Sequence, residues 1–199
     1  MVWDVSLIWR WVGLGSLGWT LALTLRIPLV VAMRRVTNSP SALEHLTVLS
    51  SGPLEELVRL GMLAIAGNSF TIAYSVGLGW GGIEVVYAVF TGYATAVLAS
   101  GTDTQADQVR ERLRELGALS PAAPLLGVLE RASAAALHVG FALLLATWPV
   151  LIVALAPLHS SINLGVLATT RRNPLAAQSL LAGVSITAFL AGLSAFERI

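Results

Sequence analysis

The sequence predicts an all-α fold, a polytopic transmembrane bundle of about six helices that forms a single integral membrane domain over residues 1–199. The first observation behind this prediction is composition. Of the 199 residues, 56% are hydrophobic and 12% are charged, whereas soluble domains carry roughly 25% charge. The second is the length of the apolar stretches. At about 20 residues per membrane crossing, they leave room for five to seven helices and no separate soluble domain.

The composition also excludes several kinds of chemistry and partner. The chain has no cysteine, which removes disulfides, thiolate nucleophiles and cysteine-ligated metals. A formal net charge of +1 gives no reason to expect nucleic acid. The first apolar segment has no basic region before it and no small-residue cleavage site, so we expect it to be retained as a helix in the lipid bilayer.

The first predicted helix runs from about Ser6 to Met33. Tryptophans near its start and the pair Arg34-Arg35 at its end mark the two membrane interfaces. Arg26 lies about two turns before the basic end, and its side chain can extend to that interface.

The next apolar run, residues 54–100, can be divided in two ways. Division at the glycine cluster 77–82 would leave Glu84 near a membrane surface. Division at Asn68-Ser69, the only polar pair in the run, places Glu84 near the middle of a helix. We prefer the second division.

This division predicts a second helix over about 42–67, kinked at Gly52-Pro53, and a third over about 70–98. The polar loop 101–124 follows, with apolar residues at helical spacing that predict a short helix lying on the membrane surface. The last three predicted helices are about 125–148, 151–170 and 174–196.

Six helices place most arginines on one side of the membrane, namely Arg34, Arg35, Arg110, Arg112, Arg114, Arg171 and Arg172. Arg10 and Arg198 fall on the other side. Because the arginine-rich side of a membrane protein is cytoplasmic, we expect a multi-pass protein of the cell membrane with both termini outside.

Ionisable residues within these apolar helices are the most informative feature of the chain, because a charge in the bilayer costs several kcal/mol. Such residues usually serve chemistry or transport. They are Glu55, Glu56, Arg59, Glu84, Glu130, Arg131, His138 and His159, with Asn163 one turn after the last.

Glu55 and Glu56 are adjacent, and Arg59 lies three or four residues later, within reach of either carboxylate on a helix. The simplest interpretation is that the arginine neutralises one of them. The other then lacks a local counter-charge, which suits a general base that activates water, and equally a proton carrier.

Gly77, Gly81 and Glu84 share one helix face, and small residues spaced by four allow a neighbouring backbone to approach closely. Packing alone accounts for the glycines. The presence of Glu84 on the same face predicts that close packing directs its carboxylate into the bundle.

His138 lies seven residues after Arg131, on the same helix face, with Glu130 beside Arg131. His159 and Asn163 are one turn apart, and an imidazole next to an amide donor is suited to hold a developing oxyanion. Hydrogen-bonded packing is the alternative for each of these residues.

Zinc is a possible cofactor rather than a favoured one. Histidines and carboxylates at similar depth could bind the ion and leave a position for water, but the chain has no HExxH spacing. The ligand set would be Glu55, Glu84, His138 and His159.

Four ordered motifs resemble one family. They are Glu55-Glu56-x-x-Arg59, Gly77-x-Gly79-x-Gly81-Gly82-Ile83-Glu84, Glu130-Arg131 followed by His138, and His159 with a polar residue four later. This pattern resembles the YhfC family of intramembrane peptidases and, more distantly, the CAAX prenyl endopeptidases and PrsW-like glutamic proteases. The resemblance covers about 54–163, within a peptidase core of 42–170. Trp80 departs from it, because relatives often have histidine there.

The resemblance implies an intramembrane protease in which Glu55 or Glu56 activates water and Arg59 orients the other carboxylate. His138, with Glu84, would assist proton transfer, and His159 with Asn163 would stabilise the oxyanion. Glu130, Arg131, Gly77 and Gly81 would support the site. The substrate would be a membrane-embedded or lipid-modified peptide. A zinc-dependent protease and a non-enzymatic scaffold or proton-coupled carrier are the alternatives.

Overall fold

The computed structural model describes residues 8–197, and the regular structure within that range is entirely helical. The predicted helix start at Ser6 and the outward-facing Arg198 lie outside the described residues. The elements are α1 (Trp9–Arg34), α2 (Pro40–Leu49), α3 (Ser51–Ala66), α4 (Phe70–Ala99), α5 (Thr104–Glu115), α6 (Ala123–Thr147), the short 3-10 helix η1 (Pro149–Leu151), α7 (Ile152–Thr170) and α8 (Pro174–Glu197).

The structure confirms the predicted all-α polytopic bundle. Five helices of the described chain are long and apolar enough to cross a membrane: α1, α4, α6, the segment Pro149–Thr170 that contains α7, and α8. The preferred division at Asn68-Ser69 is confirmed, because α4 begins at Phe70 with the Ser69 hydroxyl accepting the Ile72 N–H.

The predicted second helix is where the structure differs. Instead of one kinked helix over 42–67, it contains two shorter helices, α2 and α3, which meet at Ser50. Pro53 has no N–H to donate to the Leu49 carbonyl four residues earlier, and its ring crowds that carbonyl. The helix therefore breaks before the proline, and neither piece has the length of a membrane-spanning helix.

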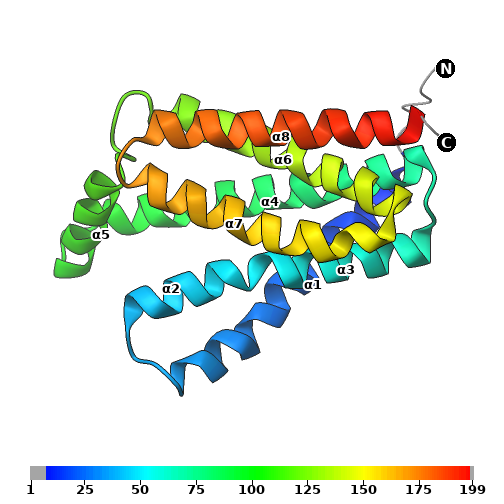
Figure 1. Ribbon diagram of the computed structural model, residues 1–199. Helices are drawn as coiled ribbons and strands as arrows, with labels where there is room; N and C mark the ends of the chain where they lie inside the picture. The colour runs from blue at the N-terminus through cyan, green and yellow to red at the C-terminus, as the bar shows by residue number, and fades with distance from the viewer. Residues whose placement is uncertain (1–7, 198–199) are drawn as a thin grey trace.

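The helices of the bundle run along a common direction, with α8 over α6 and with α7 beside α3 (Figure 1). The most extensive packing joins α6 to α8, α4 to α6 and α1 to α4. The close approach predicted at two glycines is confirmed: a Cβ added at Gly77 or at Gly81 would lie 2.6 Å from the Cα of a residue on α6. This contact fixes the depth of α4 against α6.

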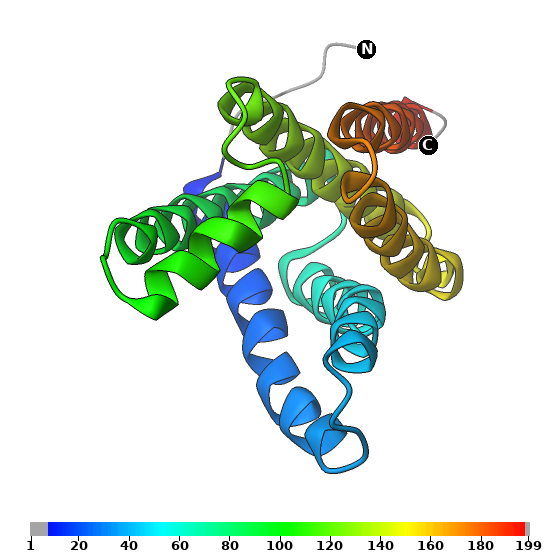
Figure 2. The ribbon, with the colours of Figure 1, turned by 90° about the vertical axis from the view of Figure 1, so that its left-hand side faces the viewer.

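One end of the bundle carries the arginine-rich connections. The end of α1, the helix α5 and the turn between α7 and α8 all lie there, whereas the start of α1 and the end of α8 lie at the opposite end (Figure 1). Viewed from the arginine-rich end, α5 crosses the end of α4, and the last turns of α1 project away from α4, α6 and α8 (Figure 2). The short helix predicted within the loop 101–124 is present as α5, which ends before Gly117.

Candidate functional site

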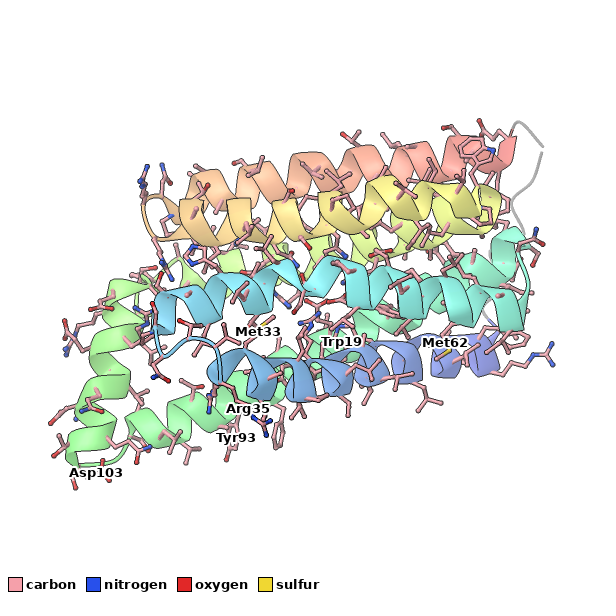
Figure 3. All side chains as sticks on the ribbon, turned by 60° about the horizontal axis from the view of Figure 1, so that its bottom comes forward. Trp19, Met33, Arg35, Met62, Tyr93 and Asp103 are labelled. Carbon is pink, nitrogen blue, oxygen red and sulfur yellow. The ribbon has the colours of Figure 1, made fainter. Side chains whose placement is uncertain are left out.

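The predicted ionisable residues come together in the middle of the bundle as one chain of contacts, which passes from α1 through α3, α7, α6 and α4 to α8. Trp19 of α1, labelled in Figure 3, lies about halfway along the bundle, and its side chain lines the cavity described below. Close packing of α1, α3 and α4 around Trp19 and Trp80 brings these helices to a common depth.

Glu56 forms the fully buried centre of the site. Nη1 of Arg59 lies 2.6 Å from each carboxylate oxygen of Glu56, and both side chains have no exposed surface. The Nδ1 atom of His159 lies 2.6 Å from Glu56 Oε1. Both oxygens of Glu56 are therefore occupied by donors, and its carboxylate has the environment of a structural anchor.

Glu55 occupies a different environment. One carboxylate oxygen forms an ion pair with Arg26 of α1, and the other accepts a 3.1 Å hydrogen bond from the indole Nε1 of Trp80. The same Oε2 lies 3.9 Å from Nε2 of His159, too far for a direct hydrogen bond. Unlike Glu56, Glu55 lines a cavity.

The partner of Glu56 agrees with the sequence prediction, and the partner of Glu55 differs from it. Arg59 neutralises Glu56, as one of the two predicted arrangements has it. Glu55 does not lack a counter-charge, however, because Arg26 turns toward it instead of extending to the membrane interface. The pairing links α1 to α3, and no spacing in the sequence indicates it.

His138 connects the buried centre to Glu84. Its Nδ1 lies 2.7 Å from Nη2 of Arg59, and its Nε2 lies 2.6 Å from Oε2 of Glu84. Because a guanidinium only donates hydrogen bonds, Nδ1 must accept, and the ring proton must be on Nε2, from which it is donated to Glu84. The contacts thus define a neutral Nε2–H tautomer for His138.

The outer part of the chain of contacts is built around Arg131. Its Nη1 donates to Glu84 across 2.7 Å, and its Nη2 pairs with Glu130. Glu130 also accepts a 3.2 Å hydrogen bond from Gln178 of α8. The prediction that Glu130 and Arg131 support Glu84 and His138 is thus consistent with direct contacts, and Gln178 extends the set to α8.

The charges of this cluster balance only if one histidine is cationic. The four carboxylates of Glu55, Glu56, Glu84 and Glu130 face the three guanidinium groups of Arg26, Arg59 and Arg131. His138 is held neutral by Arg59. His159 lies between two of the carboxylates, and a proton on each ring nitrogen would neutralise the cluster, which matters because a net buried charge is costly.

Asn163 lies on α7 one turn after His159, and both line the cavity. Its amide Nδ2 donates a 2.9 Å hydrogen bond to the hydroxyl of Ser51, at the start of α3. An amide nitrogen carries two donors, so the second N–H is available for another acceptor.

Ser160 positions the glutamates by bridging the break between α2 and α3. Its hydroxyl donates to the Leu49 carbonyl at 2.6 Å and accepts the Gly52 N–H at 3.2 Å. A Cβ at Gly52 would lie 2.0 Å from the Ala156 carbonyl oxygen. Only glycine allows this approach, which places the first turn of α3 against α7 and Glu56 against His159.

A cavity of about 410 Å³ connects the site to the arginine-rich end of the bundle. At its inner part lie Glu55, Glu84, His138, His159 and Asn163, and toward the arginine-rich end it is lined by Thr47, Thr170 and Arg171. A second, more apolar groove of about 1130 Å³ runs between α4 and α6 below α5 and shares Arg26, Glu84 and Arg131 with the first.

α2 covers one side of the cavity and is attached at its outer end by an ion pair. Oε2 of Glu44 lies 2.5 Å from Nη2 of Arg171, at the end of α7. This hydrogen bond from Arg171 lowers the pKa of the Glu44 carboxyl below its ordinary value.

The proposed zinc ligands do not form an ion-binding group in this arrangement. Among the residues that the structure describes, no set of three or more histidine, cysteine, aspartate or glutamate side chains is placed to hold a metal. Both ring nitrogens of His138 are occupied, by Arg59 and by Glu84.

Comparisons of this chain with protein-family models, with curated proteins and with solved structures gave no significant match.

Proposed function

We propose that the protein is an intramembrane endopeptidase of the glutamic type, in which Glu55 activates the water that attacks a peptide bond. The observation that carries this proposal is the 3.9 Å separation between Glu55 Oε2 and His159 Nε2 at the edge of a cavity. A polar pair at this distance accommodates a bridging water. The resemblance to the YhfC family, in which the same motifs occur in the same order, supports the same reaction class.

Burial separates the roles of the two glutamates. Glu56 has no exposed surface, and its oxygens are occupied by Arg59 and His159. Glu55 lines the cavity and has free lone pairs after the contacts with Arg26 and Trp80 are counted. A general base must reach the proton that it removes, so we assign the base to Glu55 and the anchoring of His159 to Glu56.

In the reaction, the water oxygen adds to the substrate carbonyl carbon while its proton passes to Glu55. The resulting oxyanion accepts hydrogen bonds from Nε2–H of a protonated His159 and from the second N–H of Asn163. When the C–N bond breaks, Glu55 returns the proton to the leaving nitrogen. The products are a carboxylic acid and an amine, and Glu55 is regenerated.

Access to the site supports a membrane-embedded or lipid-modified peptide as substrate. The cavity reaches the arginine-rich end, from which water can enter, and the apolar groove between α4 and α6 meets the same charged residues from the side. A helical substrate must be unwound locally before attack, because its backbone groups are otherwise hydrogen-bonded.

The test uses the full chain reconstituted in liposomes. The probes are synthetic peptides with one apolar segment of about 20 residues, each with a fluorophore and a quencher, in plain and farnesylated forms. Cleavage is followed by fluorescence, and the cut bond is located by mass spectrometry. Glu55→Gln should lower the rate by about a hundredfold or more, while Glu111→Gln, at a glutamate that pairs with Arg114 within α5 and lines neither cavity, should cleave at the wild-type rate.

The outcomes separate the alternatives. Cleavage that survives Glu55→Gln would reject the assignment of the base. Loss of cleavage after treatment with a zinc chelator, with recovery on adding zinc, would favour the metalloprotease. No cleavage of any peptide by the wild type would favour a scaffold or a proton-coupled carrier, which proton flux into the same liposomes would distinguish.

A further inference from the structure

We infer that Arg26 and Trp80 are positioning residues for Glu55, so that α1 contributes to the reaction as well as α3, α4, α6 and α7. This inference rests on the proposed function, because it assigns these two side chains to the base of that reaction. Neither residue belongs to the roles that the sequence motifs imply.

The contacts leave the Oε2 atom of Glu55 open toward His159. Arg26 pairs with Oε1, and the Trp80 indole donates to Oε2 at 3.1 Å. With one donor on each oxygen, from α1 and from α4, the carboxylate plane is fixed on two sides. The remaining direction of Oε2 leads to His159 Nε2, 3.9 Å away, where the attacking water would be held.

Trp80 performs two separable tasks. Its side chain has no exposed surface, and its ring lies under the Arg59 guanidinium, with Cζ of Arg59 4.5 Å from the ring centroid. This contact is a cation–π interaction, which needs only the aromatic face. The bond to Glu55 needs the indole N–H. Trp80→Phe therefore removes the positioning contact and keeps an aromatic ring beside Arg59.

The charge and the planar geometry of Arg26 can also be tested separately. Its side chain is about one-fifth exposed and lies beside both the cavity and the apolar groove. Arg26→Met keeps an unbranched apolar chain and removes the charge, whereas Arg26→Lys keeps the charge and loses the planar fork. If Arg26 acts by its positive charge on the Glu55 carboxylate, Arg26→Lys should keep most of the effect on Glu55 that Arg26→Met removes.

The first experiment needs no substrate. The full chain in liposomes is treated at pH 7 with an apolar fluorescent carbodiimide, which adds to a protonated carboxyl group, and the adduct at Glu55 is counted by mass spectrometry. Arg26→Met should raise labelling of Glu55 about tenfold, because an opposite charge nearby favours the carboxylate. Trp80→Phe should raise it by a smaller factor, and Arg26→Lys should stay near wild type.

The matched control is Arg110→Met. Arg110 pairs with Asp107 on α5, away from the site, so its loss should leave the labelling of Glu55 unchanged. Labelling of Glu55 in Arg26→Met and Trp80→Phe equal to that of the wild type would overturn the inference. If Arg26→Met fails to fold, the labelling of Glu55 in Trp80→Phe alone tests the inference, because the phenylalanine ring retains the packing.

The second experiment uses the peptide that the wild type cleaves best. Trp80→Phe should lower kcat about tenfold, because a base that is no longer held in the productive orientation reacts more slowly. The KM should be unchanged. A rise in KM with kcat unchanged would mean that Trp80 binds substrate instead. If the wild type cleaves no peptide, the proposed function fails, and the labelling result still decides whether Arg26 and Trp80 hold Glu55.

Discussion

The hydroxyl of Ser160 donates a 2.6 Å hydrogen bond to the carbonyl of Leu49, the last residue of α2. This carbonyl loses its helical partner because residue 53 is proline. A side chain on α7 thus supplies the donor that the broken helix lacks, and the same hydroxyl accepts the N–H of Gly52. The break between α2 and α3, together with the two hydrogen bonds of Ser160, sets where Glu55 and Glu56 enter the bundle.

Ser160→Ala should therefore destabilise the protein by about 1–3 kcal/mol, the cost of leaving the buried N–H of Gly52 without an acceptor. Unfolding of the full chain in detergent, followed by tryptophan fluorescence, measures the change. Ser161→Ala is the matched control, because the Ser161 hydroxyl is exposed and bonds only within its own helix, to Pro157. Equal stability of the two variants would contradict the bridging role.

The sequence predicts the helices well but not the pairing of their charges. Helix length and hydropathy are local properties, so the ends of α4, α6, α7 and α8 follow from apolar runs and polar breaks. A pair between Arg59 and one of the two adjacent glutamates is also local, although only the structure selects Glu56. These features could be predicted because nothing outside the segment decides them.

The contacts of Arg26, Trp80 and Ser160 could not be predicted in this way. Arg26 and Glu55 are 29 residues apart and lie on different helices, and an arginine near a basic helix end is equally suited to reach the interface. A serine in an apolar helix gives no signal, although a Gly-Pro pair upstream indicates that some donor must satisfy the freed carbonyl.

The ion pair between Glu44 and Arg171 should make a small, pH-dependent contribution to stability. Because the pKa of Glu44 is lowered in the folded protein, the contribution is present above the ordinary pKa of 4.5 and is lost as the pH falls below it. Both side chains are more than one-third exposed, so the pair is worth less than about 1 kcal/mol.

Glu44→Gln should thus lower the midpoint of thermal unfolding slightly at pH 7, and the difference from wild type should fade at acidic pH. Glu111→Gln provides the comparison, because Glu111 pairs with Arg114 within α5 and ties no two helices together. A difference that grows as the pH falls would contradict the assignment.

His138 should exist at neutral pH as the neutral Nε2–H tautomer, because Arg59 can only donate to its Nδ1. The chain has three histidines, so ¹⁵N NMR of histidine-labelled protein can be assigned by single substitutions. The expected spectrum has an unprotonated Nδ1 and a protonated Nε2 for His138. A doubly protonated ring would mean that the contact with Arg59 is broken.

Glu56→Gln should cost more stability than Glu55→Gln, although both are expected to reduce cleavage. Removing Glu56 leaves the fully buried Arg59 without its counter-charge, and breaking a buried pair from one side costs about 3–5 kcal/mol. Glu55 lies at the cavity, and its partner Arg26 is partly exposed to solvent. Its substitution should therefore leave the unfolding midpoint closer to that of the wild type.

A double variant distinguishes pairing from simple loss of packing at this position. Glu56→Gln combined with Arg59→Met removes both charges, so its stability should exceed that of Glu56→Gln alone. The measurement is denaturant unfolding of the wild type, the two single variants and the double variant in one detergent. If the double variant loses, relative to the wild type, the sum of the losses of the two single variants, the two side chains act independently, and Glu56 would no longer qualify as the charged anchor of the site.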